Sequence, residues 1–269
     1  MLSKNLDIAL GKKQHAPLKD WKVFKLKTII KETELGGNYK NTKNVTNLPL
    51  IKMGNLGRGK ILLEDLNYIR RDEKIDTSHR LKFGDFLFNT RNTLDLVGKV
   101  SVWRNELKEA YFDSNIMRIK FDSKHVYDSF FMNHLFNNHD GLKQLKRIAT
   151  GTTSVAAIYT KDLMNVKLSL PPLDEQKKIN SILSTWDKAI ELKEKLIEQK
   201  KEQKKGLMQK LLTGEVRLPG FKDEWKEESL GKLVKRTKGK SLNYVEKGKY
   251  PAIDMEYLET GRFKNFTDS

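Results

Sequence analysis

Three clusters of basic, amide and hydroxyl side chains lie near expected turns and suggest ligand-binding chemistry. They are Asn55, Arg58 and Lys60; Asn89, Thr90, Arg91, Asn92 and Thr93; and Arg147 with Thr152, Thr153 and Ser154. Arginine and asparagine can donate or accept two hydrogen bonds at once on a purine edge in the major groove. Lysine, serine, threonine and backbone N–H groups bind phosphates. The clusters therefore predict a surface that reads duplex DNA, although each one alone is also compatible with an ordinary solvated loop.

Motifs for catalysis are incomplete. Gly239-Lys240-Ser241 resembles the end of a phosphate-binding loop, but Val234 occupies the position that requires the first glycine. The run from Asp174 to Lys177 has the letters of a nuclease motif at a helix start instead of on a strand, and the run from Pro251 to Glu256 lacks the lysine. The asparagine-proline-proline-aromatic signature of base-modifying methyltransferases is absent as well. We therefore predict no catalytic residue and no cofactor, with a DNA-acting enzyme, a nuclease or methyltransferase whose site follows no recognised pattern, as the alternative.

Metal binding is also not expected. The chain has no cysteine, and no pair of its histidines has the spacing of an HExxH motif or lies at i and i+4. The histidines are His15, His79, His125, His134 and His139. They are explained as surface or core side chains.

The charge balance points to an anionic partner. Lys and Arg number 52 against 35 Asp and Glu, which gives a formal net charge of +17 and a pI near 9.7. Double-stranded DNA is the first candidate, and a merely basic protein without such a partner is the alternative. No apolar run approaches the roughly 18 residues that a membrane span requires, and the first residues lack the apolar core of a signal peptide. We predict a cytoplasmic protein that does not bind membranes.

A long helix is predicted over residues 171–214. Apolar residues recur at helical spacing, at Ile179, Leu183, Trp186, Ile190, Ile197, Leu207 and Leu211. Pro171 and Pro172 mark the start, Asp174 and Glu175 place negative charge on the first turn, and Gly214 can cap the end. The 40 residues from Asp174 to Thr213 would form a rod of about 60 Å, nearly two turns of B-DNA.

This helix needs a partner. Lys193, Lys200 and Lys204 interrupt its apolar stripe, so a single helix would leave two apolar patches in water. A core helix of a globular domain is the alternative, but the length and the mostly charged remaining faces favour a coiled-coil-like rod.

The residues before the rod predict an α+β domain with a mixed sheet over residues 18–170, after an irregular segment over residues 1–17. Strands are expected at 48–53, 85–90, 99–103, 115–121 and 165–170, where apolar residues alternate or cluster. Helical spacing predicts two helices, at 126–138 and 140–149.

An internal repeat follows the rod. Trp21 and Trp225 lie 204 positions apart (225 minus 21), and matching residues follow both in the same order. The other pairs include Leu26 with Leu230, Tyr39 with Tyr244, Pro49 with Pro251, Ile51 with Ile253, Met53 with Met255 and Leu56 with Leu258. Residues 215–269 are therefore predicted to be a linker and the start of a second copy of the domain. Because the first copy needs about 150 residues to complete its sheet, we expect the second copy to lack most of the partners for its apolar side chains.

The stretch from Leu170 to Arg217 resembles the central conserved region of the specificity subunit of type I restriction-modification enzymes. The stretch from Gly151 to Pro172 is similar to the end of that family's target recognition domain, and Gly84 to Arg91 resembles a strand inside it. The resemblance covers about residues 18–269.

The resemblance implies two recognition domains, each reading one half of a bipartite DNA target, held apart by two antiparallel helices. It also implies docking to methyltransferase (modification) subunits and to a restriction and translocase subunit, which hold the active sites. The chain departs from this pattern because the second domain is only begun and a second long helix is missing.

The hypothesis from the sequence is a non-catalytic DNA-sequence-recognition subunit that reads one half-site. The apolar patches that a single long helix would leave in water predict a homodimer through this helix. There are three alternatives. The chain is a nonfunctional truncated fragment, or it gains its second half through recombination with a neighbouring locus, or it is a coiled-coil scaffold with incidental charge.

Overall fold

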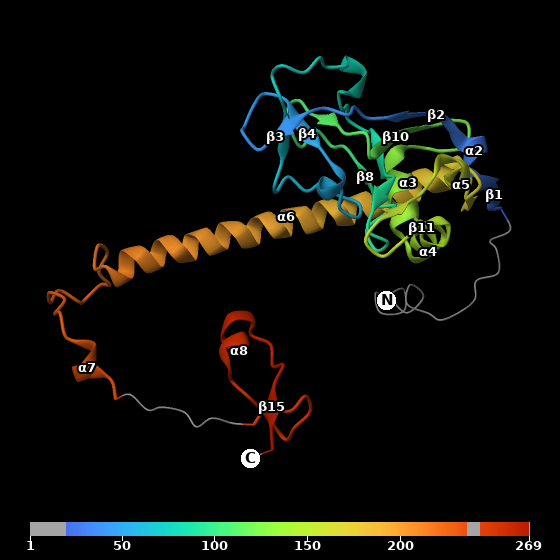
Figure 1. Ribbon diagram of the computed structural model, residues 1–269. Helices are drawn as coiled ribbons and strands as arrows, with labels where there is room; N and C mark the ends of the chain where they lie inside the picture. The colour runs from blue at the N-terminus through green and yellow to red at the C-terminus, as the bar shows by residue number, and fades with distance from the viewer. Residues whose placement is uncertain (1–19, 236–242, 269) are drawn as a thin grey trace. The chain divides into compact units, whose positions relative to one another are not determined.

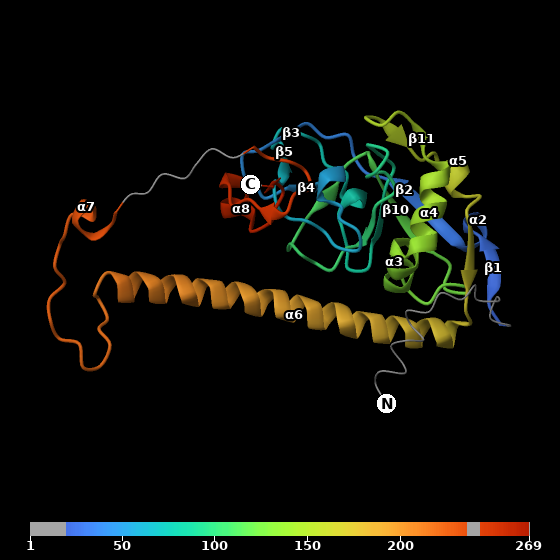
Figure 2. The ribbon, with the colours of Figure 1, turned by 90° about the horizontal axis from the view of Figure 1, so that it is seen from below.

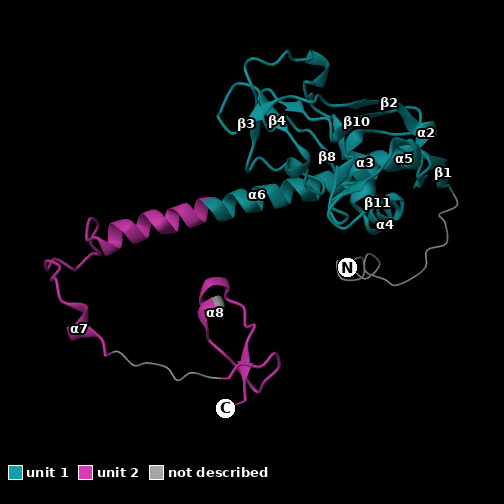
Figure 3. Cartoon of the chain, viewed as in Figure 1, with its two compact units in different colours: residues 1–198 teal, residues 199–269 magenta. Residues whose placement is uncertain are grey.

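The computed structural model describes residues 20–235 and 243–268, in two units that span residues 1–198 and 199–269 (Figure 3). The predicted irregular segment at residues 1–17 and the Gly239-Lys240-Ser241 tripeptide lie outside the described residues. The first unit combines small sheets with helices, and a long helix begins within it (Figure 1). The predicted α+β class is confirmed.

An antiparallel sheet forms the centre of the first unit. Its strand order is β2 (Ile30–Leu35), β10 (Ile116–Phe121), β6 (Phe86–Asn89) and β8 (Val100–Val102). The sequence predicted the last three from their apolar residues, but not β2. Side chains of β6 alternate between two apolar cores: Phe86 and Phe88 face one, and Leu87 faces the other. The sheet is therefore covered on both faces, which explains why its strands are buried almost throughout.

Helices cover one face of this sheet. The predicted helices are observed as α3 (Ser129–Asn137) and α4 (His139–Ile148). Asp128 caps α3 by accepting a hydrogen bond from the Phe131 N–H at 2.7 Å, and Asn138 caps α4 by accepting one from the Gly141 N–H at 2.7 Å. Phe131, Met132 and Phe136 of α3 are buried against the sheet.

A second sheet packs on the other face. Its strand order is β3 (Asn41–Thr42), β5 (Asn67–Ile69), β4 (Pro49–Ile51) and β9 (Tyr111–Phe112). The pair β4–β9 is parallel and the other pairs are antiparallel. The sequence predicted one mixed sheet. The mixed pairing is observed in this second four-stranded sheet, whereas the central four-stranded sheet is antiparallel.

Arg118 joins the strands of the central sheet through a buried charge cluster. Its guanidinium pairs with Glu34 of β2 and, at 3.1 Å, with Asp85 before β6. Burial opposes ionisation of Glu34, but hydrogen bonds from Ser78 and Arg118 offset this effect and lower the pKa of the carboxyl. Removing one partner of a buried ion pair lowers the stability of a fold by more than the pair contributes, because it leaves an unpaired buried charge. A shift in strand register would separate Arg118 from its carboxylates in this way, so the cluster favours the observed register.

The long helix α6 (Leu173–Leu212) contains 40 residues, which corresponds to about 60 Å. It lies within the predicted range 171–214, and it begins after the predicted strand β13 (Lys167–Leu170), which pairs with β1 (Lys22–Lys25). From Thr185 onward nearly every side chain of α6 is exposed, including Trp186 at 67%. The unpaired apolar stripe expected from the sequence is present.

Buried amides fasten the first turns of α6 to the first unit. The Gln176 side chain is fully buried, accepts a hydrogen bond from the Tyr127 N–H at 2.9 Å, and donates to the carbonyls of His125 and Pro171 at 2.8 and 2.9 Å. Asn180 donates to the Asp128 carboxylate at 2.8 Å. These bonds fix the direction in which α6 leaves the domain.

The second unit repeats local features of the first. The short helix α7 (Leu230–Leu233) lies 204 positions after α2 (Leu26–Ile29), as the repeat predicts. Strand β14 (Tyr250–Pro251), helix α8 (Met255–Thr260) and strand β15 (Phe266–Thr267) follow. They correspond to β4, the 3-10 turn η1 (Met53–Asn55) and β5.

Burial differs between the two copies. Ile51 and Leu56 are fully buried, whereas their counterparts Ile253 and Leu258 are each 69% exposed. Strand β9 pairs with β4 in the first copy, and no counterpart of β9 pairs with β14 among the described residues. Ile253 and Leu258 therefore do not have the burial that their counterparts have in the first copy.

Candidate DNA-binding surface

A small sheet brings the second and third predicted clusters together. Strand β12 (Ala156–Ala157) lies between β11 (Thr150–Gly151) and β7 (Arg91–Asn92). Ala157 pairs with Arg91 and Ala156 with Asn92. The Leu94 N–H also donates to the carbonyl of Thr153 at 3.2 Å, so the loop after β7 contacts the tip of the β11–β12 hairpin. Residues about 60 positions apart in the sequence thus form one surface.

The β11–β12 hairpin is held in one conformation. Gly151 has a φ of +135°, and a Cβ there would lie 2.2 Å from the carbonyl oxygen of Val155, so only glycine fits. Thr152 Oγ1 accepts a hydrogen bond from the Val155 N–H at 3.2 Å and lies 3.2 Å from Ser154 Oγ. Thr153 and Ser154 are exposed at the tip. The tip presents hydroxyl groups and backbone amides to solvent without needing to order on binding.

Arg58, from the first predicted cluster, reaches the same surface. Its guanidinium donates to the carbonyl of Asp95 at 3.0 Å, in the loop after β7, and Lys146 pairs with the Asp95 carboxylate at 3.3 Å. Partial burial lowers the pKa of Lys99, and the positive charge of Arg58 lowers it further. Arg91 and Arg147 are exposed. Arg58, Lys99 and Lys146 therefore lie around the loop after β7, in the domain that also exposes Arg91 and Arg147, and this positive charge favours an anionic ligand.

Three of the predicted residues support loops. Asn55 is buried; its side chain accepts a hydrogen bond from the Lys52 N–H at 3.0 Å and donates to the carbonyls of Leu62 and Glu64. Asn89 is fully buried and accepts from the Arg91 N–H at 3.1 Å, and Thr90 donates to the carbonyl of Asn115 at 2.9 Å. These side chains position their neighbours, and we leave them out of the proposed contact surface.

The remaining predicted residues lie at or near the surface. Lys60 is exposed, while its carbonyl holds the turn by accepting from the Gly57 N–H at 2.9 Å and from Ser101 Oγ at 2.9 Å. Asn92 and Thr93 are half-buried, and the Asn92 side chain accepts from the Thr93 N–H at 2.9 Å. Without Asn55, Asn89 and Thr90, the proposed contact surface consists of nine residues: Arg58, Lys60, Arg91, Asn92, Thr93, Arg147, Thr152, Thr153 and Ser154.

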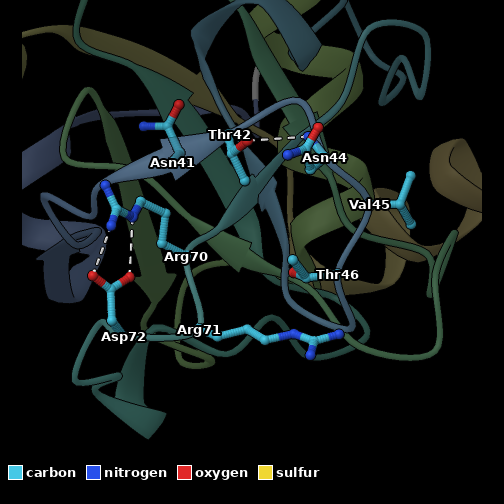
Figure 4. Close-up of a pocket in the computed structure, with 8 residues that line it drawn as sticks. All are labelled: Asn41, Thr42, Asn44, Val45, Thr46, Arg70, Arg71 and Asp72. Atoms are coloured by element: carbon cyan, nitrogen blue, oxygen red, sulfur yellow. Dashed lines mark hydrogen bonds and ion pairs between the residues drawn. The ribbon is translucent and has the colours of Figure 1, made fainter.

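Sequence reasoning missed a polar groove on the second sheet. It lies between residues 41–46, which include β3 and the start of the β3–β4 loop, and residues 70–72 after β5 (Figure 4). Two features of the sequence indicate this groove: the adjacent arginines Arg70 and Arg71, and the segment 38–47, which is rich in asparagine and lysine. The two arginines follow β5, a strand that the apolar pattern of the sequence did not predict.

Residues 20–235 and 243–268 contain no group of His, Asp or Glu side chains arranged to hold a metal ion. Within the same ranges, no helix has the length and apolar character that crossing a membrane requires.

The first unit is an α+β domain that carries a basic surface and the beginning of an exposed long helix. Residues 18–201 match the model of the family described as type I restriction modification DNA specificity domain. The chain belongs to this family.

Two curated relatives come from Methanocaldococcus jannaschii. The putative type I restriction enzyme MjaX specificity subunit is 29% identical over 195 residues, which cover 72% of this chain and 46% of the relative. The type I restriction enzyme MjaVIII specificity subunit is 30% identical over 204 residues, which cover 74% and 47%. The chain thus spans about half the length of these relatives.

A solved structure shows the same fold. The S subunit of a type I restriction-modification system from M. genitalium superposes with a TM-score of 0.55 and 16% identity. The superposition covers 96% of this chain and 64% of that one.

Proposed function

We propose that the chain is a non-catalytic DNA-sequence-recognition subunit of a type I restriction-modification complex, and that its first domain reads one half of a bipartite target. The observation that carries this proposal is the convergence of Arg58, Arg91 and the β11–β12 hairpin on one basic surface of a DNA specificity domain. Arg91 supplies a guanidinium for a guanine edge, and the hairpin supplies hydroxyls and amides for phosphates.

In this proposal α6 measures distance and joins subunits. Its length of about 60 Å approaches two turns of B-DNA, the scale on which half-sites recur along one face of the duplex. Its exposed apolar stripe pairs antiparallel with α6 of a second copy, which places two identical first domains on a symmetric target. The methyltransferase and restriction subunits dock on this assembly and perform the chemistry, in the cytoplasm where the DNA is.

The first prediction concerns salt. With a net charge of +17, the purified chain should bind duplex DNA with an affinity that falls steeply as salt rises, because each phosphate contact releases counterions. For about five phosphate contacts, the logarithm of the association constant should fall with a slope of about −4 to −5 against the logarithm of salt concentration. Fluorescence anisotropy over a salt series measures this slope. A coiled-coil scaffold with incidental charge would show no such binding.

The second prediction concerns Arg91. Replacing it with alanine should weaken binding to the target half-site by about 1–3 kcal/mol and relax the preference at one base pair, because an exposed guanidinium beside the hairpin is placed to contact a base edge. Lys124→Ala, which removes one exposed positive charge in the turn between β10 and α3, is the control. An equal loss on every sequence would assign Arg91 to a phosphate, and no loss would remove it from the interface.

The enzyme alternative is tested separately. The purified chain alone should leave DNA unchanged in the presence of S-adenosylmethionine and Mg²⁺. Turnover without added subunits would contradict the proposal.

A further inference from the structure

The groove on the second sheet is built from groups that read DNA bases, although none of the predicted clusters includes it. It has a volume of about 570 Å³ and is lined by amide, hydroxyl and guanidinium groups. Val45 stands beside these groups and is 77% exposed. Figure 4 shows that the lining side chains come from two segments: β3 with the β3–β4 loop, and the residues that follow β5.

The β3–β4 loop is fixed by its own hydrogen bonds. Thr46 Oγ1 donates to the carbonyl of Ile69 at 3.2 Å and accepts from the Leu48 N–H at 3.2 Å, and Thr42 Oγ1 accepts from the Asn44 N–H at 3.1 Å. The loop therefore holds the exposed Asn44 and Val45 side chains outward in a defined position. A surface that is ordered before binding loses less conformational entropy when its ligand arrives.

The two arginines behind the loop differ in their surroundings. Arg70 is held flat by two parallel hydrogen bonds to Asp72, from Nε at 3.0 Å and from Nη2 at 2.9 Å. Arg71 is exposed, and among the described residues no hydrogen bond or ion pair engages its side chain. Because Asp72 neutralises Arg70, Arg71 carries the uncompensated positive charge of the groove.

We infer that the β3–β4 loop and Arg71 form a second base-reading element that contacts the same half-site as the Arg91 surface. This inference rests on the proposed function. An amide such as that of Asn44 matches the edge of adenine, a guanidinium matches guanine, and an apolar tip such as Val45 matches the methyl group of thymine. A site for a free anion would use the arginine and hydroxyl groups but would have no use for an exposed apolar tip.

The position of the loop agrees with this role. In Figure 2 the β3–β5 edge and the β11 hairpin both lie on the side of the domain away from α6. A duplex laid along that side meets the hairpin and the loop, while α6 stays free to pair with a second helix. Two separated contact points also explain how one small domain can read several base pairs.

Selection of bound duplexes from a random pool, using the full-length chain, tests the inference. The variants are Arg71→Ala and the double substitution Asn44→Ala with Val45→Ala, and the control is Lys124→Ala. All four side chains are exposed, so circular dichroism melting should confirm unchanged folding. Each groove variant should lose the preference at one or two positions of the selected motif and bind the original motif about tenfold more weakly. The positions that depend on Arg91 should stay unchanged.

The possible outcomes separate the inference from the proposed function. A wild-type motif that changes with Arg91→Ala but not with the groove variants would overturn the inference alone. Groove variants that weaken all sequences by the same factor would assign the groove to phosphate, which also overturns it. A wild-type chain that selects no motif would overturn both the inference and the proposed function.

Discussion

Placing glutamates at Leu207 and Leu211 should convert a dimer of the chain into a monomer. Both leucines line an apolar groove on α6, where Leu207 is 59% exposed. Burying a leucine side chain contributes about 1.5–3 kcal/mol. In an antiparallel dimer each of the two leucines would be buried once in each chain. Replacing both with glutamate should therefore raise the dimer dissociation constant by more than about 100-fold. Glutamate is a good helix former, so α6 itself should persist.

Light scattering on the eluting protein measures this effect. The wild-type chain should have twice the monomer mass of 31.2 kDa, and the double variant should have the monomer mass. Gln209→Glu is the matched control, because position 209 lies on the opposite face of α6 and should leave the dimer intact. A wild-type chain that stays monomeric, both free and with the modification subunit, would remove the homodimer from the account.

Replacing Gln176 with leucine should loosen the attachment of α6 to the domain. The change removes three hydrogen bonds and leaves the Tyr127 N–H and two carbonyls without their side-chain partner in a fully buried site. Buried polar groups left unpaired cost about 1–3 kcal/mol each, and partial relaxation makes a total of about 2–4 kcal/mol the expected loss. In the proposed assembly, α6 would then no longer set the direction from one recognition domain to the next.

Native-state hydrogen exchange localises that loss. Peptides that cover residues 123–131 and the first turns of α6 should exchange faster in Gln176→Leu. Lys177→Leu, at the adjacent exposed position, is the control and should change stability by no more than about 0.5 kcal/mol. Unchanged exchange in the Gln176 variant would show that the helix is held by other contacts.

The sequence predicted the elements whose apolar residues alternate, cluster or recur at helical spacing. The stripe from Ile179 to Leu211 specified α6, and the apolar runs specified β6, β8, β10 and β13. The repeat was visible for the same reason, and α2 and α7 place its first short helix 204 positions apart in both copies. Such patterns are visible in a sequence because burying one face of an element requires an apolar residue at each turn of a helix or at every second residue of a strand.

The parts that the sequence did not predict depend on contacts between distant segments. The strands β7, β11 and β12 contain two residues each, too few for any periodicity, and they exist because the chain brings Arg91 beside Ala157. Arg118 looks like a solvent-facing residue of an alternating strand, yet a second sheet and two carboxylates bury it. Asn55 and Asn89 likewise have the chemistry of base readers but are buried as supports.

Mapping methylated adenines in DNA treated with this chain and its modification subunit tests the central claim most directly. The account predicts methylation confined to one bipartite sequence whose two halves are inverted copies of each other, with Arg91→Ala relaxing the same position in both halves. Methylation at scattered sites, or the same pattern when the chain is left out, would contradict the claim that this chain reads the DNA sequence.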